Sequence, residues 1–574
     1  MVRVTELSIE GYRSIKEHIT IRFPENVPLV LVGENNAGKT NILRALDLIL
    51  GETWPGTREP EDHEFWQRDA VNGKIQISVK FDGLTADAWR SIVCFDWTYD
   101  PTQGESRCDF KAMLSDGEQR YVKSEWRDQC ICVLMSADRR LSYHLSYSSK
   151  WTLLSKLMRR FHSSLTRDDT RVERLKAKFQ EIEQIFHEVE EFAHFREGLA
   201  RQFGEMFAGM SYGLDVDFSA YDPSRYFHSL QIVPHEGGQR RTLEELGTGQ
   251  EQLLALAFVY AYGKAFHGGI LLAIEEPEAH LHPLAQEWLA RKIYQMAADG
   301  LQIVITTHSP HFVDLLGLEG LVLVRKDQEG ATQVCQLTRQ ELAKYCISKG
   351  AHPQRTTADT ILPFYANQST QEILNGFFAK KIILVEGQTE ELALPEYLRK
   401  VGLDVTREGV AVIPVMGKGN LAKWWRLFTA YGIPTYVIFD NDARDDREGE
   451  KRKDILRALG ILENDWEQYL RAEEFVITPQ FAVFGKDFEH TMRSMFPEYS
   501  ELEEEAKDVF GDSKPIVARY VARRLEVKSE LQVWEKYKKL ADAISKVSCR
   551  ADGEASGHDP SHPLPGAGGA GEAV

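Results

Sequence analysis

The sequence predicts an α/β protein of two successive domains, and three observations point to it. Short apolar runs alternate with helical periodicity along most of the chain, which is the pattern of sheets covered by helices. A glycine-rich loop follows one such run at 33–40. Two later runs, at 382–385 and 436–439, end in carboxylates. A chain of 574 residues is also long enough for more than one hydrophobic core.

The composition is that of a globular protein, with 43% apolar residues and a net charge of −18. This charge argues against a uniformly basic nucleic-acid binder, although it leaves room for local basic patches. No apolar run is long enough to cross a membrane, and the N-terminus has no signal-peptide pattern, so we expect a cytoplasmic protein without a membrane partner. The scattered cysteines predict neither a disulfide framework nor a zinc site.

The first domain begins with an alternating hairpin at 4–23 and a buried strand at 28–32. The strand leads into G-x-x-x-x-G-K-T, and an apolar helix follows at 41–50. In this context the glycines let backbone N–H groups surround phosphate oxygens, the lysine reaches the β- and γ-phosphates, and the threonine binds magnesium. The alternative is a chance glycine loop. The candidate nucleotide-binding residues are Gly33, Asn35, Asn36, Gly38, Lys39 and Thr40.

Further strands are expected at 74–82, 91–98, 108–113 and 129–135. Residues 151–208 have a helical a/d pattern, with Asp168 and Asp169 as a cap. The apolar stripe of this segment needs a partner. It either packs as a hairpin against 151–165 or forms a subunit interface, which would make it a dimerisation insertion.

Three polar clusters follow further along the first domain. Gly247, Gly249 and Gln250 form a glycine-rich turn before an apolar helix, which again presents N–H groups to an anion. A buried strand at 270–274 ends in Glu275 and Glu276, which can hold magnesium and orient the attacking water. Another strand at 302–306 leads to a polar cluster that contains His308. Each cluster is a weak signal alone, and their order carries the prediction.

This order resembles the ATP-binding-cassette (ABC) heads of the structural-maintenance and recombination-repair ATPases, such as the RecF and Rad50 proteins. The resemblance implies ATP as the cofactor, the loop at 33–40 as Walker A, 247–250 as the signature and His308 as the switch histidine. Glu275 and Glu276 become Walker B, with Glu276 catalytic, although Glu275 stands where aspartate is usual. Because such heads complete each other's ATP sites, the resemblance also implies a homodimer or a higher homo-oligomer.

The second domain alternates strands and helices, and its acids fall at strand ends. Glu386 follows the strand at 382–385, Glu390 lies four residues later, and Asp440 and Asp442 end another strand. Carboxylates at the mouths of neighbouring strands form an oxygen cage for a divalent cation. The turn at 416–420 could contact phosphate or be a plain connection. The pairing of Glu-Gly with Asp-x-Asp resembles a Toprim domain.

An ABC-type head followed by a Toprim domain resembles the OLD (overcoming lysogenization defect) family of nucleases, and the Gabija defence nuclease has the same layout. The resemblance implies DNA cleavage at a two-metal site with Mg²⁺, Mn²⁺ or in part Ca²⁺. It makes Glu386, Asp440, Asp442 and a late lysine the catalytic residues. Lys514 is the selected lysine, with Lys486 and Lys528 as competitors. The implied metal ligands are Glu386, Glu390, Asp440, Asp442 and a later acid from the pair Asp487 and Glu489, of which Glu489 is favoured.

The leading hypothesis is therefore an ATP-regulated, metal-dependent DNA nuclease of phage defence or DNA repair, with a helicase as one conceivable partner. The ATPase head is expected at 1–378, the Toprim domain at 379–546 and a disordered tail at 547–574. The main alternative is a RecF- or Rad50-like repair ATPase with a non-catalytic Toprim domain. A nucleotide-switched interaction protein is a further class. A topoisomerase or primase fits less well, because we identify no candidate tyrosine nucleophile in a DNA-gate domain and no cysteine spacing typical of a zinc module.

Overall fold

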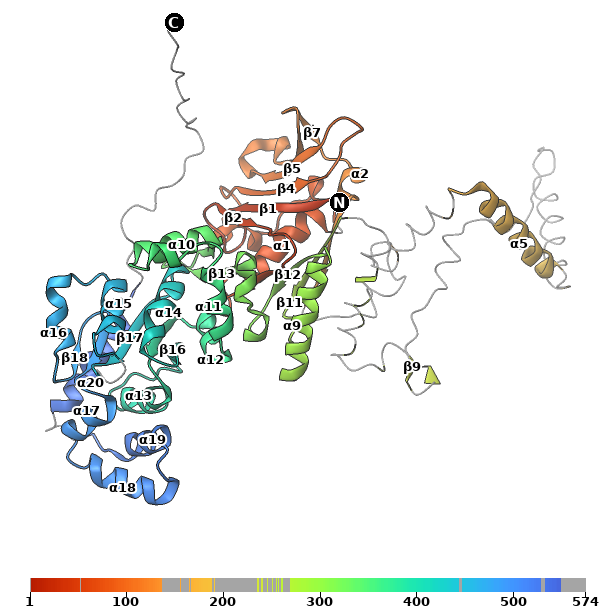
Figure 1. Ribbon diagram of the computed structural model, residues 1–574. Helices are drawn as coiled ribbons and strands as arrows, with labels where there is room; N and C mark the ends of the chain where they lie inside the picture. Colours follow the sequence, from red (N-terminus) through yellow and green to blue (C-terminus); the bar gives the residue numbers. More distant parts are fainter. Residues whose placement is uncertain are drawn as a thin grey trace, which may run out of the picture. The chain divides into compact units, whose positions relative to one another are not determined.

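The structure is a computed structural model that describes residues 2–136, 269–442, 446–527 and 532–548, except Glu52, together with parts of 155–261. The chain divides into two compact units, Met1–Gln336 and Leu337–Val574. Each unit contains its own sheet system and core, so we describe each by itself (Figure 1). No helix within the described part of the chain combines the length and hydrophobicity needed to cross a bilayer.

The first unit begins with an antiparallel sheet. Its six strands lie in the order β2-β1-β4-β5-β6-β7. Buried and exposed residues alternate along β4, as expected for a sheet with one face on the core. The expected hairpin at 4–23 and the next three expected strands are confirmed. The strands are β1 (Arg3–Glu10), β2 (Ile19–Arg22), β4 (Ile75–Asp82), β5 (Ile92–Tyr99), β6 (Cys108–Leu114) and β7 (Gln119–Tyr121).

A second sheet of the first unit carries the predicted nucleotide site. Its order is β14-β13-β3-β12-β11-β8, and all neighbours are parallel except β13 and β14. Because parallel strands end at one edge, the segments after β3, β11 and β12 meet there. α1 (Lys39–Leu50) and α9 (Pro283–Ala298) follow two of these segments. The strands are β3 (Leu29–Val32), β8 (Cys130–Met135), β11 (Gly269–Glu275), β12 (Gln302–Thr306), β13 (Leu321–Lys326) and β14 (Thr332–Gln336).

Only part of the expected helical insertion lies within the described residues. α5 (Asp169–His187) is a helix inside the predicted range 151–208, and the Asp168 side chain accepts the N–H of Thr170 at its start. The question of whether the stripe of this helix meets a hairpin or a second subunit falls on residues outside those described. The expected disorder of the tail concerns 549–574, which also lies outside them.

The second unit is built on a five-stranded sheet in the order β16-β15-β17-β19-β18, parallel except at β18. The expected alternation of strand and helix is confirmed. The strands are β15 (Lys381–Val385), β16 (Val410–Pro414), β17 (Thr435–Asp440), β18 (Val476–Ile477) and β19 (Phe481–Phe484). The helices nearest the site are α13 (Gln388–Lys400), α14 (Lys418–Ala430), α17 (Phe488–Met495) and α19 (Lys514–Arg524).

Helices cover both faces of this sheet (Figure 1). On one face α13, α17, α18 (Tyr499–Phe510), α19 and α20 (Gln532–Lys546) enclose an aromatic core. Tyr397 stacks on Tyr537 at its centre, with 4.8 Å between ring centroids. α14 packs on the other face against β15 and β17. The core thus fixes the strand ends that carry the acids.

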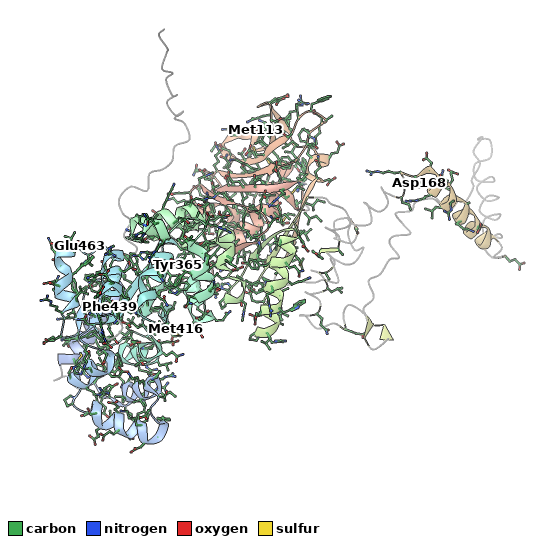
Figure 2. All side chains as sticks on the ribbon, in the orientation of Figure 1. Met113, Asp168, Tyr365, Met416, Phe439 and Glu463 are labelled. Carbon is green, nitrogen blue, oxygen red and sulfur yellow. The ribbon has the colours of Figure 1, made fainter. Side chains whose placement is uncertain are left out.

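Residues 337–378 were assigned from the sequence to the end of the first domain, and in the structure they lie within the second compact unit. They form α10 (Arg339–Ser348), α11 (Ile361–Gln368) and α12 (Gln371–Leu374). Tyr365, labelled in Figure 2, packs edge-on against Trp424 of α14 with 5.2 Å between ring centroids. Arg426 also donates a hydrogen bond to the carbonyl of Lys349 at 3.0 Å. These contacts hold α10 and α11 against α14.

Candidate functional sites

Two glycines of the loop at 33–40 have conformations and surroundings that only glycine tolerates. Gly33 has a φ of 137° and Gly38 a φ of 109°. A Cβ atom at Gly33 would lie 2.0 Å from the carbonyl oxygen of Val324, and one at Gly38 would lie 2.2 Å from Oγ1 of Thr332. The hairpin of β13 and β14 therefore packs tightly against the loop. The positive φ values of the two glycines give the loop a backbone conformation in which successive N–H groups can face an anion.

Lys39 begins α1, and its ammonium lies inside this loop. Nζ donates hydrogen bonds to the carbonyl oxygens of Gly33 at 2.8 Å and of Glu34 at 2.7 Å. Burial lowers the pKa of Lys39 to about 8, against the attraction of Glu276 and Glu278. A phosphate would give the ammonium a charged acceptor in place of two neutral carbonyls. The other predicted residues of the loop lie exposed: Asn35, Asn36 and Thr40.

The acidic turn after β11 and the turn after β12 meet beside this loop. Glu275 is the buried last residue of β11. Glu276 has a φ of 44°, and its N–H donates to the carbonyl of Thr306 at 2.9 Å. Oε1 of Glu276 lies 3.8 Å from Nε2 of His308. Burial and the charge of Lys39 lower the pKa of His308, so the imidazole is mostly neutral at neutral pH.

Sequence reasoning missed Glu278 in this cluster. Its Oε1 accepts the backbone N–H of His308 at 2.6 Å. Its Oε2 is buried without a hydrogen-bond partner in the described structure, and burial raises the pKa of this carboxyl. Glu278 therefore ties the acidic turn to the histidine turn. Its place in the Glu-Glu-Pro-Glu run was the one available signal, since the contact joins residues that are far apart in the sequence.

The predicted signature can be placed only in part. Gln250 is helical and exposed, whereas Gly247 and Gly249 lie outside the described residues. The roles of all three residues, like those of the Walker residues, remain predictions. The structure does bring Lys39, Glu276 and His308 together at one sheet edge, as the parallel order of the strands implies.

In the second unit, Glu386 joins the ends of the two strands that the sequence singled out. It follows β15 directly, and its Oε1 accepts the backbone N–H of Asp440 at the end of β17, at 2.7 Å. Burial raises the pKa of Glu386, and the charge of Lys418 opposes this shift. Asp442 adds electrostatic repulsion to Glu386 from the turn beyond β17. The predicted meeting of the strand ends is therefore present.

Glu390 and Asp440 are the most strongly perturbed carboxyls at this edge. Oε2 of Glu390 accepts the N–H of Gly387 at 3.0 Å, at the start of α13. Burial, with repulsion from Glu386 and Glu489, raises the pKa of Glu390 to about 7. The pKa of Asp440 is raised well above its usual range by burial and then by Glu390 and Glu386. We call Glu386, Glu390, Asp440 and Glu489 the carboxylate cluster.

The cluster has the chemistry of a divalent-cation site. Oδ1 of Asp440 is buried and has no hydrogen-bond partner among the described residues. Several carboxylates that raise one another's pKa are stabilised together by a hard cation, which prefers oxygen ligands. No group of three or more His, Cys, Asp or Glu side chains within the described ranges already has metal-binding geometry. Hydrogen bonds to Gly387 and Asp440 instead hold two of these carboxylates on the backbone.

The late candidates differ in their surroundings. Asp487 is the N-cap of α17, where its side chain accepts the N–H of His490 at 2.7 Å. Glu489 acts electrostatically on Glu390 and Asp440, so it belongs to the cluster. Nζ of Lys514 lies 3.5 Å from Oε1 of Glu489, at the start of α19. The Lys514 side chain is itself 68% exposed; of its predicted competitors, Lys486 is exposed as well and Lys528 lies outside the described residues.

A second residue that sequence reasoning did not select as a site residue is Lys418, the first residue of α14. Its Nζ lies 3.5 Å from Oε1 of Glu386 and donates a hydrogen bond to the carbonyl of Asp442 at 3.0 Å. The turn at 416–420 had been noted in the sequence for a phosphate contact. In the structure its lysine lies instead against the Glu386 carboxylate and the Asp442 carbonyl.

Comparison with known families matches both units. The family model "AAA ATPase domain" matches residues 3–150 and 132–313, which together cover more than half of the chain. The model "Overcoming lysogenization defect protein-like, TOPRIM domain" matches residues 377–442, the segment from β15 to the turn after β17. This second match contains Glu386, Glu390, Asp440 and Asp442, and it also contains Lys418.

Two similar nucleases match about four fifths of this chain, and a third protein matches about one third of it. The chain is 26% identical to the OLD nuclease of Thermus scotoductus over 496 residues, which cover 82% of this chain and 90% of that protein. It is 23% identical to the Old nuclease of Escherichia phage P2 over 79% of this chain and 80% of that protein. Endonuclease GajA of Bacillus cereus is 27% identical over 33% of this chain and 29% of its own length.

Proposed function

Because the chain belongs to the OLD family of nucleases, with an ATPase domain followed by a Toprim domain, we propose that it cleaves DNA at the carboxylate cluster under the control of ATP. The observation that carries the proposal is the buried, partnerless Oδ1 of Asp440 among carboxyls of raised pKa. Such a set of acids costs stability unless a cation is bound, so it is best explained by function. The proposed setting is phage defence or DNA repair.

In the proposed nuclease site, the chain supplies oxygen ligands and a positive charge. Glu386, Glu390, Asp440 and Asp442 would hold divalent cations, with Mg²⁺ or Mn²⁺ as the proposed ions, and Glu489 would be the late ligand. Cations at such a site activate water and stabilise the leaving oxygen of a phosphodiester. Lys514, whose Nζ lies 3.5 Å from Oε1 of Glu489, would offset the charge that develops on the phosphate. Asp487 would serve α17 as its cap.

In the proposed ATP site, Lys39 would exchange the carbonyls of Gly33 and Glu34 for phosphate oxygens. Thr40 and Glu275 would hold magnesium, and Glu276 would orient the attacking water beside His308. We further propose that a second copy of the chain completes this site through the signature at 247–250, which requires a homodimer or a higher homo-oligomer. A helicase partner remains a proposal from the family resemblance.

Lys39→Ala is expected to weaken ATP binding roughly 10- to 100-fold, because a charge-assisted contact to phosphate is lost. Titration with a fluorescent ATP analogue measures the effect. Lys80→Ala is the matched control, since Lys80 makes an exposed ion pair with Glu6 on the other sheet. Equal nucleotide affinity of the Lys39 variant and the wild type would contradict the assignment of the loop. Cleavage by the same variant tests the coupling of the two sites.

The proposed DNA contact uses three arginines around one buried carboxylate. Glu396 of α13 forms ion pairs with Arg399, Arg519 and Arg523, whose side chains are 60%, 43% and 54% exposed. One negative charge therefore faces three positive ones, which leaves guanidinium groups for phosphates. Arg519 and Arg523 lie about 8 and 14 Å along α19 from Lys514 and on roughly the opposite side of the helix, so they would contact phosphates on a face separate from Lys514.

Replacing both Arg519 and Arg523 by Gln is expected to weaken DNA binding about tenfold and to lower its salt dependence, since two phosphate contacts are lost. Fluorescence anisotropy in EDTA at several salt concentrations measures binding without cleavage. Arg471→Gln is the control, because Arg471 forms an exposed pair with Glu467 on another helix. A double variant with the wild-type affinity and salt slope would remove this face from the proposed DNA path.

A further inference from the structure

The turn between β16 and α14 has an unusual backbone. Met416 has a φ of 57° and Gly417 a φ of 115°, so two successive residues lie at positive φ. Met416, labelled in Figure 2, carries this conformation although its side chain is large and half exposed. Such strain persists where the surrounding contacts fix the chain. It directs the next residue, Lys418, away from solvent.

One hydrogen bond fixes this turn to the residue after β15, and another braces it internally. The N–H of Gly417 donates to the carbonyl of Glu386 at 2.8 Å. The side-chain amide of Asn420 donates to the carbonyl of Val415 at 3.0 Å, which braces the turn from inside. The start of α14 is therefore placed relative to Glu386 by backbone contacts, and the lysine side chain extends from a fixed point.

The Lys418 side chain is only 9% exposed. Its Nζ lies 3.5 Å from Oε1 of Glu386, the same oxygen that accepts the N–H of Asp440. The ammonium also donates to the backbone carbonyl of Asp442 at 3.0 Å. One cation thus contacts both acidic turns, at the ends of β15 and β17.

We propose that Lys418 is a positioning residue of the nuclease site, which orients Glu386 and the turn at Asp442 so that their oxygens can bind a divalent cation. The inference rests on the proposed function of the carboxylate cluster. A plain connection between strand and helix needs no buried ammonium, and burying one is costly unless it is paired. Groups that hydrogen-bond metal ligands commonly fix their orientation in this way.

Another lysine of the same helix shows the ordinary alternative. Nζ of Lys423 lies over the ring of Phe364 at 4.0 Å, a packing contact with α11. Lys423→Met is therefore a matched control for Lys418→Met, with the same substitution in the same helix. Lys418 could instead only fill the metal position with its own charge. That role makes the opposite prediction, because removing the ammonium would then tighten divalent-cation binding.

The test measures Mn²⁺ binding to the full chain by calorimetry without DNA, and then cleavage of plasmid DNA. Lys418→Met is expected to weaken Mn²⁺ binding and to slow cleavage at saturating Mn²⁺, each by about 10- to 100-fold. Lys418→Arg, which keeps the charge and the donors, should stay close to the wild type. An unchanged far-UV circular-dichroism spectrum shows that the variants are folded, and unchanged ATP hydrolysis shows that the first unit is unaffected. If the Met variant fails to fold, Lys418→Gln carries the same expectation, since it loses the charge and keeps a donor.

Two results would overturn the inference: unchanged Mn²⁺ affinity and cleavage in the Met variant, or tighter Mn²⁺ binding by it. Failure of the proposed function would look different. In that case the wild-type chain would bind Mn²⁺ and cut no DNA, while the effect of Lys418→Met on Mn²⁺ affinity would still decide the role of this lysine.

Discussion

Glu386→Gln is expected to reduce DNA cleavage at least about 100-fold, more than the loss of a residue that only supports a ligand. Glu386 provides a charged oxygen at the point where the ends of β15 and β17 meet, and its Oε1 accepts the N–H of Asp440 at 2.7 Å. Glutamine keeps an acceptor for that N–H and removes the charge. The substitution therefore tests the cation site with little disturbance of the backbone.

Plasmid cleavage in Mn²⁺ measures this effect, and ATP binding by the same preparation reports on the fold of the first unit. Glu467→Gln is the control, because Glu467 is an exposed acid of α16 (Trp466–Leu470) that pairs with Arg471. A Glu386 variant that still cuts DNA with the same dependence on Mn²⁺ would show that the cleavage site lies elsewhere.

Glu390→Gln is expected to abolish cleavage and, at the same time, to stabilise the metal-free protein at pH 8. The pKa of Glu390 is raised to about 7 by burial and by neighbouring acids. The unfolded chain ionises this group near pH 4.5 at no such cost, so the raised pKa destabilises the fold increasingly as the pH rises from there to about 7. Removing the carboxylate should recover on the order of 1–3 kcal/mol above pH 7.

Thermal unfolding in EDTA measures this gain, which corresponds to a midpoint increase of about 2–10 °C for a unit of this size. The difference between variant and wild type should shrink as the pH falls from 7 and approach zero below pH 4.5, where the carboxyl becomes protonated in both states. Added Mg²⁺ should raise the midpoint of the wild type and have less effect on the variant. A variant less stable than the wild type in EDTA at pH 8 would contradict the picture of a cluster under repulsion.

Local patterns were enough to predict the architecture and the strand ends that meet in the structure. Strand ends such as Glu386 and Asp440 follow from short apolar runs bounded by acids, because parallel strands bring their carboxyl ends to one edge. The choice between Asp487 and Glu489 also had a local signal. An aspartate just before a helix caps it, as Asp487 does by accepting the N–H of His490.

Contacts between segments that are distant in the sequence could not be predicted from local patterns. The contact of Lys418 with Glu386 depends on the positive φ of Met416 and on how β16 pairs with β15. Glu278 contacts the backbone of His308 across two strands. The Glu-Glu-Pro-Glu run and the turn at 416–420 draw attention to these residues in the sequence, but they do not show which groups the residues contact. Likewise, residues 337–378 pack on α14 through aromatic side chains such as Tyr365 and Trp424. An aromatic residue in the sequence does not show which domain its side chain packs against.

The most direct test of the central claim is cleavage of linear and supercoiled DNA by the full chain, with Mg²⁺, Mn²⁺ or EDTA crossed with ATP, ADP or no nucleotide. We expect cleavage only when a divalent cation is present, at a rate that differs between ATP and the other two nucleotide conditions. Cleavage in EDTA would contradict a cation-dependent carboxylate site. ATP hydrolysis without cleavage under any of these conditions would instead identify the chain as a repair-type ATPase with a non-catalytic Toprim domain.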